Sequence, residues 1–399
     1  MTTPTPRASA EANFNSTSVS DNPISGPTDT ESDDKSNAQN DADAEETHRK
    51  EVVASMRHYY IFFRKAILDR MQRHWSRLSP AQLAMLPENA LQKRYDAYDQ
   101  ALQANQRFFD AVLLHMGQAP SHMTEYDPAM VEPPAFELYQ WMVPDHHAHK
   151  LSGILHAVAR DWSGECADER EACYAPLTAA VESLLPLGSR VLVPGSGLSR
   201  LACEVAGLGM KSQGNDFDLF MLFTASFILN GLPFEDPTTG KRHESMRIHP
   251  WLHGLNNSLS HTDSLRALEV PDVLPVAILN NTDPSPSATA AGADATTPNA
   301  KAMARLEAQD FSMCAGDFVQ SFESLEEADS LDGFVSCFFV DTAPNVLEYL
   351  LLIYRLLRPG GVWINLGPLQ WHWNDEFSEF AYTRTCVPET DSCGLIQHP

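Results

Sequence analysis

A short apolar strand followed by a glycine turn constrains the fold of this chain more than any other stretch. Residues 190–193 are apolar and mostly β-branched after the first arginine, a run short enough for a buried strand. Gly195 and Gly197 then permit a tight bend with positive φ, and from Leu198 the apolar spacing becomes helical. A second short strand ends at Asp216, about 20 residues past Gly195. The stretch therefore predicts a strand, a glycine loop and a helix, with an acid at the tip of the next strand.

An acidic side chain at this distance from a glycine loop holds ribose hydroxyls in nucleotide-binding α/β folds. Close approach of a ligand to the loop backbone makes Gly197 a candidate binding residue beside Gly195. The motif is incomplete, because its third glycine position is Ser199 or Arg200, depending on the spacing used. The simpler alternative is that the two glycines only form a tight turn. The agreement of strand, loop, helix and acid favours a nucleotide-like ligand.

Charge and composition exclude several classes of partner. The 399 residues are 43% hydrophobic, which is ordinary for a soluble protein with room for two or three domains. The formal net charge is −25, so we expect no nucleic-acid and no membrane partner. No run of 18 apolar residues and no N-terminal signal core occurs, and seven cysteines form no CxxC motif. The expected location is the cytoplasm, with the nucleus as a second candidate.

Changes in composition along the chain predict its domain organisation. Residues 1–47 form an acidic, mostly polar tail that we expect to be disordered. Residues 48–188 carry apolar residues at helical spacing and predict a helical N-terminal region. Residues 189–376 follow a strand–helix rhythm, interrupted by a low-complexity insertion at about 280–302. Residues 377–399 are expected to form an irregular tail.

Polar side chains follow several of the predicted strands. Residues 331–340 read as a central strand, and a helix and another strand follow them. The repeated rhythm predicts a parallel sheet with right-handed crossovers, which binds ligands at the carboxyl ends of its strands. Asp216, Asp317, Asp341 and His372 lie just after predicted strands or turns. We expect them to converge on one crevice.

The histidine-rich run at residues 145–149 contains good metal ligands. It follows a proline at a predicted helix start, where Asp145 would act as a cap. No two histidines of the run are four apart and no distant ligand is indicated, so we expect no metal site. The predicted helix continues to Arg160 near its end. An arginine there either favours the helix C-terminus or reaches an anionic ligand group.

Several longer motifs carry a family resemblance: ARDWS, VLVPGSGLSRLACEVAGLG, QGND, MLFTASFILN, HPWLH, AGDF, CFFVDTAPNV and RPGGVWINLGPLQWHW. Together they resemble the carnosine N-methyltransferase family, which are S-adenosylmethionine enzymes of the seven-strand Rossmann-like class. The resemblance covers about residues 50–375 without the insertion. It implies an α/β fold, with a Rossmann-like class I methyltransferase sheet preceded by an α-helical N-terminal region.

The resemblance also implies which residues bind the cofactor, S-adenosylmethionine. Arg160 and Gly195 match positions that bind it. Asp216 replaces the family's usual glutamate, which holds the ribose, and Asp317 with Phe318 matches the pair at the adenine. One helical turn before Arg160, the family's glutamine is replaced by alanine in this chain.

The substrate implied by the resemblance is a small imidazole dipeptide, carnosine or a relative of it. Asp341 and His372 match residues that contact this dipeptide. By hypothesis, Asp341 accepts a hydrogen bond from the substrate, and His372 orients the ring or relays its proton. The alternatives are a helix N-cap for Asp341, before Thr342, and a packed aromatic loop for His372. For the assembly of this chain, we consider a homodimer.

The C-terminal end departs from the family pattern. Family members continue with a helix and two antiparallel strands that complete the sheet, whereas residues 380–399 show no such pattern. We therefore expect the terminal strands to be missing. A second hypothesis follows, in which the chain is catalytically impaired and binds S-adenosylmethionine or a partner, because the missing strands would expose a sheet edge and open the pocket. A nicotinamide dehydrogenase would share the glycine loop, but would not account for AGDF or DTA.

Overall fold

The computed structural model describes residues 14–16, 31–118, 145–236, 240–254, 260–280, 300–367, 370 and 393–397. The chain divides into two compact units. The sheet unit comprises residues 1–19, 166–230 and 273–399, and the helical unit comprises residues 20–165 and 231–272. Each unit is described by itself.

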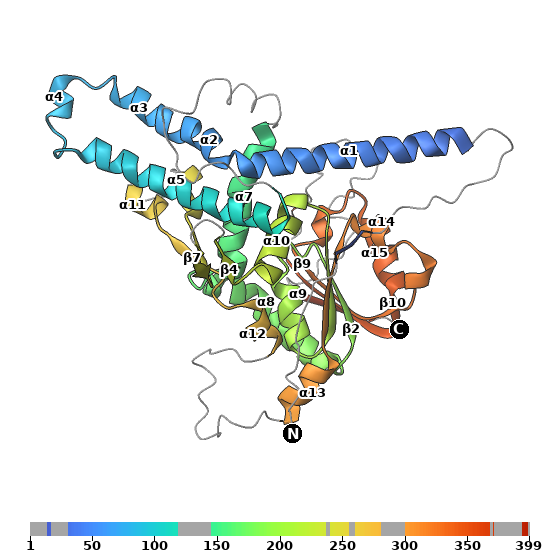
Figure 1. Cartoon of the computed structure of the whole chain (residues 1–399). Helices are drawn as coiled ribbons and strands as arrows, with labels where there is room; N and C mark the ends of the chain where they lie inside the picture. Colours follow the sequence, from blue (N-terminus) through green and yellow to red (C-terminus); the bar gives the residue numbers. More distant parts are fainter. Residues whose placement is uncertain are drawn as a thin grey trace. The chain divides into compact units, whose positions relative to one another are not determined.

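The sheet unit contains a seven-stranded sheet in the order β1-β8-β3-β2-β9-β10-β11. Figure 1 labels three of these strands, β2, β9 and β10. Its strands are β1 (Phe14–Ser16), β2 (Arg190–Pro194), β3 (Lys211–Asp216), β8 (Asp310–Ala315), β9 (Leu331–Cys337), β10 (Leu357–Leu366) and β11 (Cys393–Gln397). Strands β8, β3, β2, β9 and β10 are parallel. Counted in chain order from β2, these five strands have the order 3-2-1-4-5 of doubly wound nucleotide-binding sheets. The expected α/β class is confirmed.

Side chains alternate between the two faces of the central strands, and each face has its own core. In β9, Phe334 belongs to the core under α14 and α15, whereas the next residue, Val335, belongs to the core under α8 and α9. Strand β10 alternates in the same way, with Trp363 on the first face and Ile364 on the second. This alternation is the period-2 pattern of a strand buried on both faces.

Helices cover the sheet on both sides and connect its parallel strands. The α-helices of the sheet unit are α8 (Ala167–Leu184), α9 (Arg200–Gly207), α10 (Leu219–Asn230), α12 (Pro275–Leu279), α13 (Ala300–Ala308), α14 (Phe318–Phe322) and α15 (Val346–Leu356). Two short 3₁₀ turns are η4 (Leu325–Glu327) and η5 (Val340–Thr342). The carboxyl ends of β2, β3, β8 and β9 therefore lead into the loops that precede α9, α10, α14 and η5, where a parallel sheet places its ligands.

The helical unit consists mainly of long helices. Its helical segments are α1 (Glu31–Arg57), α2 (Tyr59–Phe63), the π-helix η1 (Arg64–Asp69), α3 (Arg70–Trp75), α4 (Pro80–Leu83), α5 (Ala90–His115), α7 (Asp145–Trp162), the 3₁₀ turn η2 (Pro250–His253) and α11 (His261–Ser264). Its short strands are β4 (Phe234–Glu235), β5 (Arg242–His243), β6 (Met246–Ile248) and β7 (Leu268–Val270), paired as β4-β5 and β6-β7. Helix α5 packs on α1, α2 and β6, and α7 packs on α1, η2 and β7.

The two units do not follow the linear division expected between residues 188 and 189. Helix α8 belongs to the sheet unit, because Tyr174, Leu177 and Val181 enter the core formed with β2, β10 and α9. The segment 231–272 instead joins the helical unit, because β6 packs against α5 and η2 against α7. These contacts join segments about a hundred residues apart, so composition along the chain does not reveal them.

Both ends of the chain differ from the expected irregular tails. Helix α1 begins at Glu31, within the segment 1–47 that was expected to be disordered, and β1 pairs in parallel with β8. Strand β11 pairs antiparallel with β10, so the expectation that the sheet lacks its terminal strands is wrong at this edge. Most of the insertion expected at about 280–302, namely residues 281–299, lies outside the described residues. Within the described part of the chain, no helix is both long enough and apolar enough to cross a membrane.

Candidate functional site

The glycine loop after β2 has the backbone that the sequence predicts. Gly195 and Gly197 have φ values of 56° and 53°. Ser199, at the position of a third glycine, also has a left-handed φ of 63°, and its N–H donates to the Ser196 carbonyl at 2.7 Å. The Ser199 hydroxyl lies 2.9 Å from the sulfur of Met313. The loop therefore keeps its turn although it lacks the third glycine.

The two glycines have different surroundings. A Cβ built on Gly195 would lie 2.6 Å from Cδ2 of Phe339, so an aromatic ring covers this glycine closely. A Cβ built on Gly197 would have no heavy atom of the described residues within 4 Å. Gly197 therefore presents an open backbone to a ligand, whereas Gly195 is needed for packing as well as for its turn. The sequence alone did not distinguish these two roles.

Asp216 lies at the carboxyl end of β3 and contacts the glycine loop directly. The Gly197 N–H donates to Asp216 Oδ2 at 2.8 Å, and the Asp218 N–H donates to Oδ1 at 2.9 Å. Burial raises the pKa of the Asp216 carboxyl, whereas the N–H groups of Asp218 and Gly197 oppose this rise. The predicted pairing of glycine loop and downstream acid is thus present as a hydrogen bond.

Asn215 was not predicted as a site residue, although it connects the glycine loop to the end of β8. Its side-chain amide donates to the backbone carbonyls of Cys314 and Gly316 at 3.2 and 3.0 Å, and its backbone carbonyl accepts from the Ser196 N–H at 2.9 Å. The side chain is buried, so these bonds satisfy a donor that water does not reach. The sequence did offer one signal for Asn215, because it is a polar residue of the QGND motif and stands directly before the candidate acid.

Asp317 and Phe318 follow β8, the strand next to β3. Asp317 is exposed and caps α14, because its Oδ1 accepts from the N–H groups of Val319 and Gln320 at 2.9 and 3.1 Å. The Gly316 N–H donates to the Asp216 carbonyl at 2.9 Å, which brings the two acids to the same edge of the sheet. This is the arrangement that the sequence predicts.

The Phe318 ring is part of the core and is 3% exposed. It contacts the rings of Phe334, Phe339 and Tyr349 at centroid distances of 5.8, 5.3 and 5.1 Å. The ring of Phe339 therefore contacts both Phe318 and Gly195. Sequence reasoning missed Phe339, although it stands two residues before Asp341 in the CFFVDTAPNV motif.

Asp341 lies in η5, after β9, and is 4% exposed. It does not cap the next helix, because the N-cap of α15 is Asn345, whose side chain accepts from the Leu347 N–H. Instead, Asp341 Oδ2 accepts from the backbone N–H of Gln370 at 2.8 Å. Among the described residues this is the only hydrogen bond to the carboxylate. The helix-cap alternative for Asp341 is therefore wrong.

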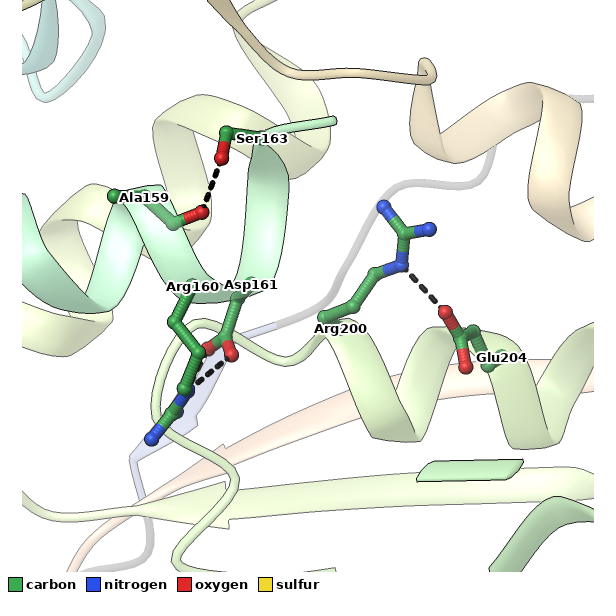
Figure 2. Close-up of polar contacts among 6 residues, drawn as sticks. All are labelled: Ala159, Arg160, Asp161, Ser163, Arg200 and Glu204. Carbon is green, nitrogen blue, oxygen red and sulfur yellow. Dashed lines mark hydrogen bonds and ion pairs between the residues drawn. The ribbon is translucent and has the colours of Figure 1, made fainter. Parts of the chain in front are cut away.

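Two predicted residues cannot be related to this cluster. His372 lies outside the described residues, so both interpretations of it stay predictions. Arg160 belongs to the helical unit, in the last turn of α7. Its Nε and Nη2 donate to the two carboxylate oxygens of the buried Asp161 at 2.7 and 3.1 Å, while 47% of the Arg160 side chain is exposed (Figure 2).

A buried ion pair supports the helix that follows the glycine loop. Arg200 Nε donates to Glu204 Oε1 at 2.6 Å, one turn further along α9 (Figure 2). Burial raises the pKa of Glu204, and the charge of Arg200 opposes that rise. The Arg200 side chain is only 7% exposed. Arg200, which replaces a glycine of the longer loop motif, therefore has a structural role in the first turn of α9.

The sheet order and the loop–acid pair define an α/β nucleotide-binding enzyme fold, the class to which Rossmann-like methyltransferases belong. Residues 139–387 match the family described as carnosine N-methyltransferase. The chain belongs to the carnosine N-methyltransferase family.

Individual relatives agree with this assignment. The carnosine N-methyltransferase of Schizosaccharomyces pombe is 33% identical over 84% of this chain and 80% of its own length. The protein of the same name from Rattus norvegicus is 29% identical over 86% of this chain and 76% of its own length. A solved SAM-dependent methyltransferase from Aquifex aeolicus aligns with 49% of this chain and 65% of its own, at 11% identity and a TM-score of 0.26. The family assignment rests on the sequence relatives.

Proposed function

We propose that this chain transfers the methyl group of S-adenosylmethionine to an imidazole nitrogen of carnosine, giving anserine, or of a related histidine-containing dipeptide. The observation that carries the proposal is the hydrogen bond between the Gly197 N–H and Asp216, at a loop whose open face can admit a ligand, in a chain of the carnosine N-methyltransferase family. The acceptor dipeptide within that class, a homodimer, and a cytoplasmic or nuclear location stay predictions.

The residues of the sheet unit fit the nucleoside part of the cofactor. Asp216 offers carboxylate oxygens, which accept hydrogen bonds from a ribose diol, at the tip of the second central strand. Gly197 leaves space for close approach to the backbone. Asp317 has an exposed carboxylate whose Oδ2 accepts no hydrogen bond from a described residue, and it stands at the tip of the third central strand. The buried Phe318 ring contributes a wall rather than a free stacking face.

S-adenosylmethionine supplies an electrophilic methyl group on a positively charged sulfur. An imidazole nitrogen that attacks this carbon forms an N–CH₃ bond as the S–CH₃ bond breaks, and the ring stays positive until its other nitrogen loses a proton. A carboxylate at that N–H would select the reactive tautomer and stabilise the cationic ring. We assign this role to Asp341, whose Oδ1 accepts no hydrogen bond from the described residues.

The family resemblance assigns roles to two further residues, Arg160 and His372. Arg160 is anchored on Asp161 and keeps an exposed guanidinium, which suits an anionic group such as the carboxylate of the cofactor. His372 follows Gln370, the residue that donates to Asp341, by two positions in the chain. We propose that His372 orients the substrate ring or relays its proton.

The binding-only alternative is not favoured. It depended on missing terminal strands and an exposed edge of β10, whereas β11 pairs along β10 from Val362 to Leu366. Full-length protein should bind S-adenosylmethionine in isothermal titration and should methylate carnosine. Binding without methyl transfer to any histidine-containing dipeptide would refute the proposed reaction and favour the alternative.

The Asp341→Asn variant tests the assigned role. Asparagine retains an oxygen that can accept from the Gln370 N–H, but it has lost the negative charge. We expect carnosine turnover to fall by about 100-fold or more, while affinity for S-adenosylmethionine changes little. Glu348→Gln, on the exposed side of α15, is the matched control and should leave both quantities unchanged. An equal loss of turnover and of cofactor affinity in Asp341→Asn would contradict the assignment.

A further inference from the structure

Three potential metal ligands converge in the helical unit, and none of them is assigned to methyl transfer. His48 and Glu51 stand three residues apart on α1, and His147 stands near the start of α7. One ligand atom from each side chain can be chosen so that all three lie within 4.8 Å of one another. The packing of α7 on α1 brings these residues together although about a hundred residues separate them.

Glu51 lies at the centre of the group. Its Oε2 is 3.9 Å from His48 Nδ1 and 3.7 Å from His147 Nδ1. Ligands at about 2.0–2.1 Å from a tetrahedral zinc ion are about 3.4 Å apart. The Glu51 distances would have to shorten by about 0.3–0.5 Å, and a separation of up to 4.8 Å within the group by about 1.4 Å, to reach bonding geometry. Shared between two side chains, each of these movements is less than 1 Å.

Exposure differs among the three side chains in a way that suits an ion near the surface. The His147 side chain is 5% exposed, whereas those of Glu51 and His48 are 31% and 41% exposed. The buried histidine forms the floor of the group, and the other two leave access for an entering ion and for water as a fourth ligand. Three protein ligands and one water complete a tetrahedral zinc site.

We propose that His48, Glu51 and His147 bind one divalent transition-metal ion of the zinc class and thereby link α1 to α7. Two imidazole nitrogens and one carboxylate oxygen suit zinc and its neighbours, whereas magnesium and calcium prefer oxygen ligands only. The site belongs to the helical unit and takes no part in the proposed methyl transfer.

Simple ion pairing does not account for this group as well. The Glu51 Oε2 atom lies 3.9 Å from His48 Nδ1 and 3.7 Å from His147 Nδ1. Both distances exceed the about 2.7–2.9 Å of a charge-assisted hydrogen bond, so neither histidine forms a close ion pair with Glu51.

Chelator-treated, full-length protein provides the direct test. Titration with zinc chloride should show one ion bound per chain, and cobalt(II) should give the visible absorption of a tetrahedral site. Zinc should raise the thermal midpoint, because it binds the folded state. Glu51→Gln, His48→Ala and His147→Ala should each weaken zinc binding by at least tenfold and remove most of this rise.

The matched control is His74→Ala, which removes an exposed histidine from α3 and should leave zinc affinity unchanged. If His147→Ala impairs folding because the side chain is buried, the more exposed His48→Ala still tests whether the group binds zinc. The proposal is overturned if the wild-type protein binds no zinc, or if binding persists unchanged in His48→Ala and Glu51→Gln. Cobalt absorption without tetrahedral character would also overturn the assigned ligands.

Discussion

Gly195 and Gly197 share a left-handed backbone, but substitution by alanine should affect them differently. A Cβ on Gly195 would lie 2.6 Å from Phe339 Cδ2. Carbon atoms in contact are about 3.5–4.0 Å apart, so the ring would have to retreat by about 1 Å. Phe339 is 7% exposed and stacks on Tyr349 at 5.1 Å, which leaves little room for that movement.

The expected cost of each substitution follows from these surroundings. A left-handed backbone costs alanine about 1–2 kcal/mol, and overpacking a close-packed core costs about 1–3 kcal/mol more. We therefore expect Gly195→Ala to lower the free energy of unfolding by about 2–5 kcal/mol. The new methyl group of Gly197→Ala has no heavy atom within 4 Å in the part of the chain that the structure describes, so this variant should lose only about 1–2 kcal/mol.

Urea unfolding at 25 °C measures the free energy of unfolding of both variants, provided that their m-values match that of the wild type. In a Phe339→Leu background, Gly195→Ala should cost only the backbone term, which gives a coupling energy of about 1–3 kcal/mol. Binding of S-adenosylmethionine should reverse the order: Gly197→Ala places a methyl group on the open face of the loop and should weaken binding more than Gly195→Ala. Equal stability losses without coupling to Phe339 would refute this account of the loop.

Two further predictions concern stability. Asn215→Ala leaves the backbone carbonyls of Cys314 and Gly316 without this donor and should cost about 1–3 kcal/mol in urea unfolding, whereas Gln213→Ala, at the half-buried position of β3, should cost less. Burial lowers the pKa of His253 in the folded protein to about 4. Between about pH 6.5 and 4 the unfolded chain therefore binds a proton at His253 that the folded protein does not bind. Stability should therefore fall by about 3 kcal/mol as the pH drops through that window. His253→Gln should flatten this dependence, and an unchanged pH profile in that variant would contradict it.

The parts of the fold predicted correctly from sequence are those set by short-range patterns. The strand of β2, the glycine turn and the acid of β3 depend on residues within about 30 positions of one another, and all of them are present. The strand expected over residues 331–340 ends earlier, at Cys337, because Phe338 has a left-handed φ of 53° and turns the chain into η5. A positive φ at phenylalanine depends on its tertiary surroundings and has no sequence signal.

Several features that sequence reasoning missed depend on distant contacts. The ring of Phe339 against Gly195 joins residues more than a hundred positions apart, and composition along the chain does not report such contacts. The same limitation applies to the metal ligands, because the histidine-rich run carries only one of them and α1 supplies the other two. Strand β11 was missed because the apolar pattern at Cys393–Gln397 is short and isolated.

The environment of Asp341 connects the fold to the proposed chemistry. A carboxylate that is 4% exposed and accepts one hydrogen bond from the described residues uses little of its acceptor capacity. Burying an under-satisfied charge costs free energy, so a residue selected for stability alone would be replaced or capped more fully. Asn345, not Asp341, serves the helix that follows. We propose that a ligand donates to the remaining acceptor capacity, and the N–H of a substrate imidazole is such a donor.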